Sequence, residues 1–296
     1  MKSPSLLIII SRKAKHSTVT ALIEEAKKKF ESVACVPVDK IQIQTSDQGV
    51  GLFYKGKNLL AFDVIYPRVS SVDFLLAEPI LKALESAKAY VPVSLRAFQV
   101  TNHKYFTSQV LSNNNVPGVV STLFISSRRA EMAVSETGYP FVMKLISGFA
   151  GKGVVLVRER EQMESILDTV TLFEEFISTQ KFIKGKKFDV RCYVIGDLVL
   201  AVKRNSKKGD WRSNISRGGS AHLMNASPEL IAIAQKSAKL LGLDICAVDL
   251  MLNKNKWVVI EVNFMPGPFM KFLGLTVIHE WVRLMFEKSL AKRSNS

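Results

Sequence analysis

Two apolar segments near the end of the chain, ICAVDLML (residues 245–252) and KWVVIEVNF (residues 256–264), each carry an acidic residue in their middle. A short polar stretch separates them, so the sequence predicts a β-hairpin. An isolated ionised carboxylate in a poorly solvated site costs several kcal/mol unless it is paired, protonated or bound to a metal ion. Asp249 and Glu261 therefore require a cation close by.

The expected register of this hairpin brings the two acids together. With the turn centred on Asn255, Asp249 lies directly opposite Glu261. Asn263 then lies on the same face as Glu261, because side-chain direction repeats every two residues along a strand. Three such oxygen donors suit Mg²⁺ held between protein and nucleotide phosphates. The alternative is an edge hairpin with one solvated face, which the apolar neighbours of both acids disfavour.

The beginning of the chain predicts a β-α-β unit and hence a parallel sheet. An apolar strand over residues 5–11 is followed by an amphipathic helix over residues 17–30 and by a second apolar strand over residues 33–38. Ser17 or Thr18 is the expected N-cap of the helix.

The elements that follow predict two further lobes. A strand ending in IYPRV and a helix over VDFLLAEPILKALESA complete a first lobe, residues 1–98. A helix from Thr101 and two strands joined by a glycine-containing loop form a central lobe, residues 99–176. Further strands, a helix from Pro228 to Leu241 and the closing hairpin form a third lobe, residues 177–296. The expected fold class is α/β, with a parallel β-α-β lobe followed by two α+β lobes.

The composition narrows the class of protein. No segment approaches the roughly 18 consecutive apolar residues of a membrane span, so we expect a cytoplasmic protein that acts away from membranes. Cys35, Cys192 and Cys246 are scattered through apolar runs and are expected to be reduced core residues. The net charge of +15 favours anionic partners such as nucleotides, acidic peptides or nucleic acid, without choosing among them.

A second candidate feature is Lys144, which lies in the apolar strand FVMKLI just before a loop containing Gly148, Gly151 and Gly153. The backbone N–H groups of such a loop can close over phosphates. The loop does not have the spacing of a Walker A motif. By itself, an exposed lysine beside a glycine-rich turn is the simpler interpretation.

A third feature is the basic segment KRNSKKGDWRSNISRGGSA, residues 203–221. Its arginines, Arg204, Arg212 and Arg217, suit recognition of phosphates and carboxylates. A solvated loop and a nucleic-acid-binding loop are the alternatives. Trp211 alone is interleaved with the charges, which is too few aromatic residues for a single-strand stacking surface, so we do not expect a nucleic-acid partner.

The order of these features resembles the ATP-grasp superfamily over nearly the whole chain. The strings DVRCYVIGD, AVKRNSKKGDWRSNISRGGSA, VDL and EVNFMPG are similar to the RimK-like family of α-L-glutamate ligases. Similar strings occur in LysX and in the ligases that glutamylate archaeal coenzymes. The joint match of RSNxxRGG with EVNxxPG is specific to this branch, whereas each short string alone is not.

The resemblance implies a role for each matching residue. ATP would be contacted by Lys104, Lys144, Gly151 and Gly153 at its phosphates, by Glu174, Glu175, Phe176 and Ile177 at adenine and ribose, and further by Asp189, Arg212, Ser213 and Asn214. Magnesium or manganese, as two ions, would be held by Asp249, Glu261 and Asn263. Arg204, Arg217 and Arg212 would stabilise the acyl phosphate and the tetrahedral intermediate.

The resemblance also implies the activity, an ATP-dependent ligase that joins a carboxylate to an amine through an acyl phosphate. The implied amine is L-glutamate, and the implied acceptor is the carboxylate of an acidic peptide, a protein C-terminus or a coenzyme. A LysX-like or coenzyme-type ligase that uses a carrier protein or small molecule and another amino acid is one alternative. A basic nucleotide- or nucleic-acid-binding protein without catalysis is another. The sequence leaves a homo-oligomer open.

Two departures from the family pattern fall near the expected site. Glu174 stands where a RimK-like hinge often has glutamine. The segment FMPGPFMKF follows the expected metal ligands where a small-residue SSPG turn is common. Its bulky Phe264 and Phe269 would reshape the acceptor pocket.

Overall fold

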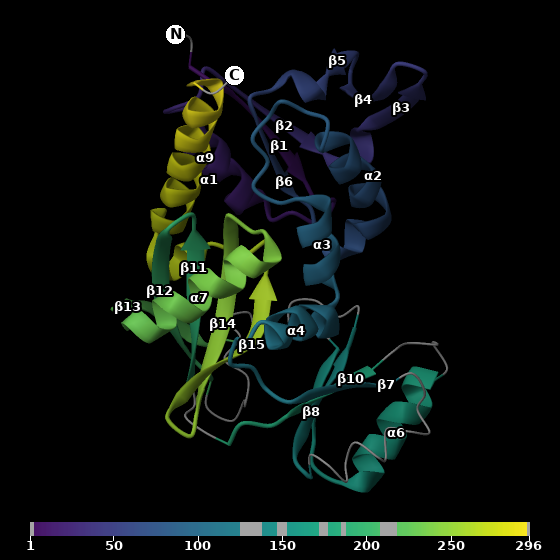
Figure 1. Ribbon diagram of the computed structural model, residues 1–296, viewed down its shortest axis with the longest axis vertical. Helices are drawn as coiled ribbons and strands as arrows, with labels where there is room; N and C mark the ends of the chain where they lie inside the picture. The colour runs from purple at the N-terminus through teal and green to yellow at the C-terminus, as the bar shows by residue number, and fades with distance from the viewer. Residues whose placement is uncertain are drawn as a thin grey trace.

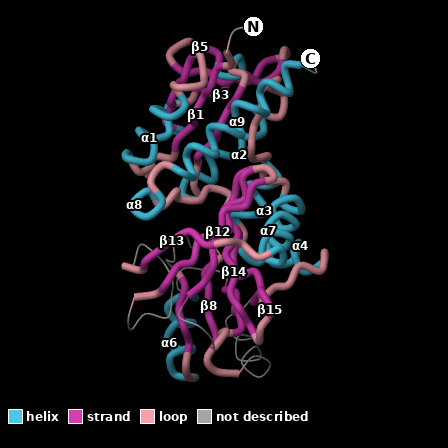
Figure 2. Tube along the Cα trace, turned by 90° about the vertical axis from the view of Figure 1, so that its left-hand side faces the viewer, coloured by secondary structure: helices cyan, strands magenta, loops and turns pink. Residues whose placement is uncertain are grey.

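The computed structural model describes residues 3–124, 138–146, 153–171, 177–184, 188–207 and 218–294. Three parts follow one another along the long axis of the molecule (Figure 1). An N-terminal lobe with a parallel sheet lies at one end, a five-stranded sheet in the middle and a four-stranded sheet at the other end. The two chain termini lie together at the N-terminal-lobe end in both Figure 1 and Figure 2.

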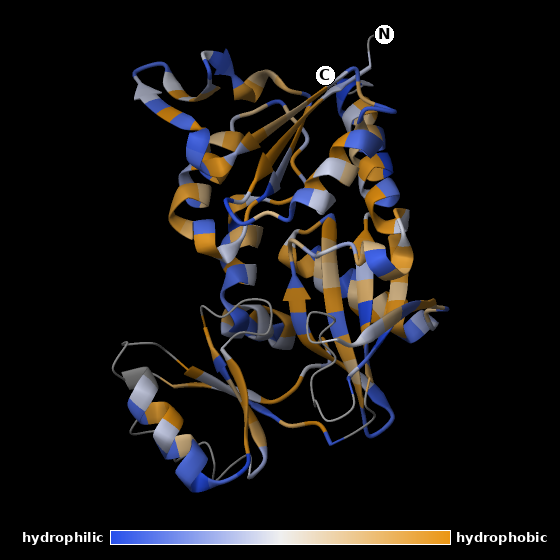
Figure 3. Cartoon of the chain, turned by 180° about the vertical axis from the view of Figure 1, so that it is seen from behind, coloured by the Kyte–Doolittle hydropathy of each residue, from blue (hydrophilic) through white to orange (hydrophobic). Residues whose placement is uncertain are grey.

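The N-terminal lobe confirms the predicted β-α-β unit. Its elements are β1 (Ser5–Ile10), α1 (His16–Ala26), β2 (Ser32–Pro37) and β6 (Val64–Arg68), and its parallel sheet has the order β2-β1-β6. The strands are continuous apolar runs because helices cover both faces of such a sheet. This is visible as orange strands beneath mixed-colour helices in Figure 3.

The predicted N-cap of α1 is wrong. The cap is Lys15, which is extended and makes no side-chain capping bond, so Ser17 and Thr18 lie inside the first turn. The loop before the helix folds back onto itself, with the Ala14 N–H donating to the Ser11 carbonyl. Residue type favoured a hydroxyl cap, but this local contact fixes an earlier start.

The same lobe contains a small antiparallel sheet that the sequence analysis did not separate. Its order is β3-β4-β5, and the 3₁₀ turns and the helix around it complete the lobe. The elements are β3 (Gln42–Ser46), β4 (Gly49–Tyr54), β5 (Lys57–Asn58), η1 (Val38–Lys40), η2 (Leu59–Ala61), η3 (Ser71–Asp73) and α2 (Phe74–Leu84).

Two helices, α3 (Leu95–Asn102) and α4 (Lys104–Asn113), connect this lobe to the rest of the chain. The sequence predicted one helix from Thr101, which is wrong because the chain is extended at His103 (φ −97°, ψ 97°). The His103 Nδ1 accepts a hydrogen bond from the Phe106 N–H, so His103 is the N-cap of α4. This break makes Lys104 the first residue of α4.

The four-stranded sheet is antiparallel with the order β7-β10-β8-β9. Its elements are β7 (Ser121–Phe124), β8 (Phe141–Leu145), β9 (Val154–Val157) and β10 (Ile177–Lys181), with helix α6 (Arg160–Thr171) packed on one face. The expected lobe boundaries at residues 98 and 176 stay predictions.

The five-stranded sheet is antiparallel with the order β13-β12-β11-β14-β15. Its strands are β11 (Phe188–Ile195), β12 (Leu198–Asn205), β13 (Ser220–Met224), β14 (Ile245–Asn253) and β15 (Lys256–Asn263). The predicted helix is confirmed as α7 (Pro228–Leu241), with Ser227 as N-cap and Gly242 in the left-handed conformation at its end.

The last helix, α9 (Thr276–Ser294), follows the short α8 (Met270–Leu273) and joins the lobes. The fully buried Trp281 packs in a core that includes residues of β1, β6, β11 and β14. Arg293 forms an ion pair with Asp63 at 2.7 Å, and the Lys292 ammonium donates to the Ala89 carbonyl at 2.8 Å. In the part of the chain that the structure describes, no helix has the length and hydrophobicity needed to cross a membrane.

Candidate active site

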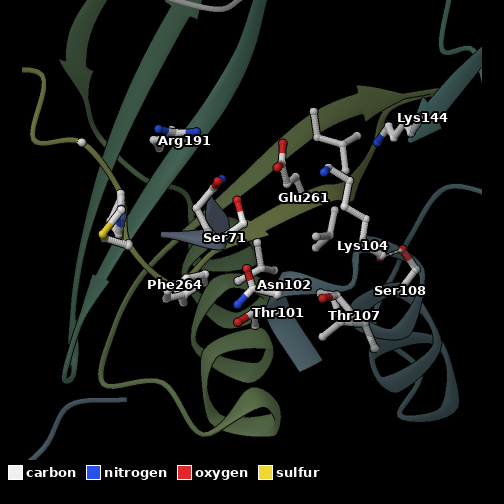
Figure 4. A pocket seen from close by; sticks show the side chains of 18 of the residues that line it. Ser71, Thr101, Asn102, Lys104, Thr107, Ser108, Lys144, Arg191, Glu261 and Phe264 are labelled. Atoms are coloured by element: carbon white, nitrogen blue, oxygen red, sulfur yellow. Dashed lines mark hydrogen bonds between the residues drawn. The ribbon is translucent and has the colours of Figure 1, made fainter. Parts of the chain in front are cut away.

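A cavity of about 1140 Å³ lies where the three parts of the molecule meet. The N-terminal lobe contributes Ser70 and Ser71, the connecting helices contribute Lys104, and the two larger sheets contribute Lys144 and Glu261 (Figure 4). The cavity therefore collects polar side chains that lie far apart in the sequence.

The β14–β15 hairpin supplies the acids of the site through an irregular register. Its turn is formed by Lys254 and Asn255, which are both in the left-handed conformation (φ 46° and 66°). Leu250 pairs with Val259, but the register then shifts so that Asp249 pairs with Glu261. The predicted pairing of the two acids is confirmed.

The reason for that pairing differs from the predicted one. Asn253 pairs with Lys256, so the turn is not centred on Asn255. An extra residue, Ile260, forms a β-bulge that restores the register of the acids. In a regular hairpin with this turn, Glu261 would point to the opposite face from Asp249.

Asp249 is buried and held by two arginines. Its two oxygens each accept a 2.7 Å hydrogen bond from Arg191, and Oδ2 lies 3.0 Å from Nη2 of Arg204. Burial raises the pKa of Asp249, but the two guanidinium groups outweigh burial, so the pKa lies below its usual value.

Arg204 also contacts a second buried acid, Asp189, at 2.5 Å. Here burial and the neighbouring Asp249 charge outweigh the arginines and raise the pKa of Asp189 to about 6. The four residues Asp189, Arg204, Asp249 and Arg191 thus form one chain of alternating charges beneath the cavity.

Glu261 has a different environment. It forms no hydrogen bond or ion pair with any residue in the described part of the chain. Burial lowers the pKa of Lys104 and of Lys144, and the Glu261 charge opposes this shift in both. In the close-up view, Glu261 lies between Lys144 and Arg191 (Figure 4). Its carboxylate is therefore surrounded by cations but remains open to a ligand.

Asn263 completes a donor set that fits a hard divalent cation. Its amide Nδ2 is buried without a hydrogen-bond partner among the described residues. Because a half-turn exchanges the nitrogen and oxygen of an amide, Oδ1 can take this position and face a cation. Two carboxylates and an amide are oxygen ligands of the kind that Mg²⁺ prefers. Within the described ranges, no group of three His, Cys, Asp or Glu residues offers a competing site.

Comparison with known proteins assigns the chain to a family. Residues 6–98 match the RimK PreATP-grasp domain, and residues 101–280 match the RimK-like ATP-grasp domain. The chain belongs to the RimK-like ATP-grasp family. The predicted family, ATP-grasp fold and class of ATP-dependent ligase are confirmed.

A probable alpha-L-glutamate ligase of Hydrogenovibrio crunogenus is 35% identical over 265 residues, which cover 88% of each chain. Two solved structures share the fold. The ATP-grasp ligase PsnB, complexed with a phosphomimetic variant of its minimal precursor, Mg and ADP, has a TM-score of 0.74 at 16% identity, covering 98% of this chain and 100% of PsnB. A RimK domain protein from Sphaerobacter thermophilus has a TM-score of 0.70 at 17% identity, covering 95% and 99%.

The RimK-like cavity brings together only part of the site that the sequence predicted. Five of the predicted residues line it: Lys104, Lys144, Arg204, Glu261 and Asn263. Asp189 and Asp249 lie behind the arginines. Gly153, in the left-handed conformation (φ 71°), accepts a 2.8 Å hydrogen bond from Leu145, and Ile177 is a buried residue at the start of β10. The remaining predicted residues lie outside the described residues: Gly151, Glu174, Glu175, Phe176, Arg212, Ser213, Asn214 and Arg217.

Arg191 is a residue of this RimK-like site that was not predicted from the sequence. Arg191 lines the cavity and pairs directly across β11 and β14 with Asp249. A signal was present, because a cation in the apolar strand FDVRCYVI needs a partner as much as an acid in ICAVDLML does. The pairing of these two strands, which are far apart in sequence, could not be seen from either segment alone.

Proposed function

We propose that this protein joins L-glutamate to the carboxylate of an acidic peptide, a protein C-terminus or a coenzyme, with an acyl phosphate as intermediate. The observation that carries the proposal is the position of Lys104 and Lys144 in the same cavity as the open carboxylate Glu261. Phosphate groups need cations, and their bound metal needs an oxygen ligand. The cavity offers both.

The two lysines are suited to the phosphates of ATP. Lys104 is the first residue of α4, and Lys144 lies on β8 beside the turn that contains Gly153. Burial disfavours the charged form of both side chains, and a phosphate between them restores it by supplying opposite charge. Nucleotide binding and lysine protonation are thus expected to be coupled.

Glu261, Asn263 and Asp249 would hold magnesium or manganese, as one or two ions. When bound, the metal would neutralise charge on the phosphate oxygens. Arg191 and Arg204 compete for Asp249, which leaves Glu261 as the most accessible ligand of the three.

The reaction then has two steps. An oxygen of the acceptor carboxylate bonds to the γ-phosphorus, the bond to the β-phosphate oxygen breaks, and ADP leaves. The glutamate amine next bonds to the acyl carbon, phosphate leaves with the bonding electrons, and the amine loses a proton. Arg191 and Arg204 line the cavity and can offset the negative charge that develops on the acyl oxygen. Arg217 stays a prediction for the same role.

The charges around the cavity favour an anionic acceptor. Among the described lining residues, the cations are Lys15, Lys104, Lys144, Arg191, Arg204 and Lys271, and the acid is Glu261. Arg191 and Arg204 are paired with Asp249 and Asp189, so the lysines are the cations that favour an acceptor with further carboxylates beside the nucleotide.

The test is ADP release with Mg²⁺-ATP and L-glutamate across a panel of an acidic peptide, a γ-glutamyl coenzyme and an acidic carrier protein. Mass spectrometry on each acceptor measures the gain of a glutamyl group. Acceptor-dependent ADP release with this gain supports the proposal. Binding of ATP without ADP release in the presence of any acceptor, with glutamate or with other amino acids, would contradict ligase activity.

A further inference from the structure

The segment that follows β15 gives one end of the cavity an aromatic wall. Its side chains Phe264, Met265, Phe269, Met270 and Phe272 all line the cavity. Polar or small residues would be expected there if the cavity held only glutamate and phosphates, because glutamate has no large apolar group to cover this surface. The segment therefore indicates a further substrate group.

Phe264 is held in place from the connecting helices. Its ring packs edge-on against Phe98 at 5.2 Å, and Phe98 stacks on Phe74 at 5.4 Å. Phe98 is fully buried, so the ring that supports Phe264 is itself packed on all sides. Phe264 itself is only half-buried and keeps part of its surface on the cavity.

Phe269 is held in place by a strained loop. Its backbone is in the left-handed conformation (φ 50°, ψ 40°), which is unusual for a bulky residue and marks a position that its surroundings enforce. Two buried side chains pin the preceding carbonyls: Arg68 donates to Pro266 at 3.2 Å, and the Tyr193 hydroxyl donates to Gly267. The loop cannot relax without breaking these bonds.

The ring of Phe269 lies next to the charged side chains of the candidate active site. It lies 5.2 Å from the guanidinium carbon of Arg191 and packs edge-on against Tyr193 at 6.0 Å. Arg191 in turn holds Asp249. A substrate group that touches Phe269 is therefore next to the reacting centre.

The aromatic wall lies away from the lysines assigned to the nucleotide. In the close-up view, Lys144 and Phe264 lie on opposite sides of Glu261 (Figure 4). In the same view, Ser71 of the N-terminal lobe lies on the Phe264 side of Glu261, and Lys271, which also lines the cavity, follows Phe269 closely along the chain. With the phosphates at Lys144, the acceptor must enter from this end to place its carboxylate in line with the γ-phosphorus.

We propose that the acceptor presents an aromatic or large apolar side chain beside its reacting carboxylate, which packs between Phe264 and Phe269. This inference rests on the proposed function, and it narrows the acceptor to an acidic peptide with an apolar residue next to the modified position. Lys15 and Lys271, which also line the cavity, suit the remaining acidic groups of such a peptide.

The test compares two peptides that differ at one side chain, Ala-Glu-Phe-Glu and Ala-Glu-Ala-Glu. Their affinities for the full-length protein are measured by calorimetry in the presence of Mg²⁺-ADP. We expect the phenylalanine peptide to bind about tenfold more tightly, which corresponds to about 1.4 kcal/mol. Equal affinity of the two peptides would overturn the proposal.

Two variants locate the preference. Phe264→Ala removes one ring, and Phe269→Gly removes the other with a residue that tolerates the left-handed backbone. Each is expected to reduce the affinity ratio to about threefold or less. The matched control Phe106→Ala removes an exposed ring outside the cavity and is expected to keep the ratio. General damage to the site weakens both peptides equally, and a ratio that survives both cavity variants would overturn the proposal.

ADP release with the same peptides separates this inference from the proposed function. A tenfold binding preference for the phenylalanine peptide, without ADP release in the presence of either peptide, supports the aromatic subsite but contradicts the ligase reaction with these acceptors. ADP release from both peptides at equal kcat/KM supports the ligase and overturns the aromatic subsite. A preference for L-phenylalanine over L-glutamate as the amine would also overturn it, because the wall would then serve the amine.

Discussion

The two strands of the β14–β15 hairpin carry carboxylates that face each other but differ in their hydrogen-bond and ion-pair partners. On β14, the carboxylate of Asp249 is fully paired, because it receives three hydrogen-bonding contacts from Arg191 and Arg204. On β15, Glu261 is open and forms no hydrogen bond or ion pair within the described ranges. The difference teaches that one acid of the pair contributes to folding as well as function, whereas the other is available mainly to a ligand.

The N-terminal lobe contains a third acid, Asp73, whose carboxylate is buried and fully paired. Asp73 accepts hydrogen bonds from Ser11, Ser70 and Arg12, and its side chain is buried. Burial raises the pKa of Asp73, but these bonds outweigh burial and keep it below its usual value. The three carboxylates thus differ in their partners: Asp73 and Asp249 are fully paired, whereas Glu261 is paired with no residue in the described ranges.

The largest expected effect is on the open acid. Glu261→Gln should reduce ADP release by about 10³-fold, because the charge that a metal ion requires is lost. The free energy of unfolding should change by less than about 0.5 kcal/mol, because no paired donor is left behind. Steady-state ADP release and urea unfolding measure the two effects, with the exposed Glu24→Gln as control. Wild-type rates would remove Glu261 from the site.

Asp249→Asn should instead lower stability strongly. Arg191 and Arg204 would keep their buried charges without a carboxylate between them, which costs about 3 kcal/mol. Urea unfolding measures the loss. The double variant Asp249→Asn with Arg191→Met should regain part of it, because one unpaired charge is removed as well. Equal stability of Asp249→Asn and Glu261→Gln would break the distinction between the two strands.

The bulge at Ile260 tests whether the facing geometry matters. Deleting Ile260 should give a regular hairpin in which Glu261 follows Val259 and still pairs with Asp249, so ADP release should stay within about tenfold of the wild-type rate. Ile260→Val keeps the bulge and should cost less than about 1.5 kcal/mol of stability. A loss of about 100-fold in ADP release from the deletion variant, relative to Ile260→Val, would show that the bulge itself is required and not only the pairing of the acids.

The smallest expected effect is the acid sensitivity of Asp73. Its pKa is lower in the folded chain than the usual value for aspartate, so its contribution to stability is present above about pH 4 and is lost as the pH falls through the folded pKa. Between pH 5 and pH 2.5, the unfolding free energy should therefore fall more in the wild type than in Asp73→Asn. Denaturant unfolding at both pH values measures this, and parallel curves would contradict the pKa assignment.

The sequence by itself determined the features that depend on local pattern. Alternating and continuous apolar runs predicted the parallel β1-α1-β2 unit, helix α7 and the closing hairpin, because burial imposes these periods on neighbouring residues. The placement of Asp249 and Glu261 inside apolar runs predicted that both need cations, since desolvation of a charge is costly wherever the strand lies.

Only the tertiary structure decided which cation each acid receives. Arg191 and Asp249 are 58 residues apart and meet because β11 and β14 pair, which neither segment encodes alone. The left-handed Phe269 is likewise held by remote side chains, because Arg68 and Tyr193 donate to the carbonyls that precede it. The local sequence pattern determines that a buried acid needs a cation, whereas the pairing of strands far apart in the sequence determines which residue supplies it.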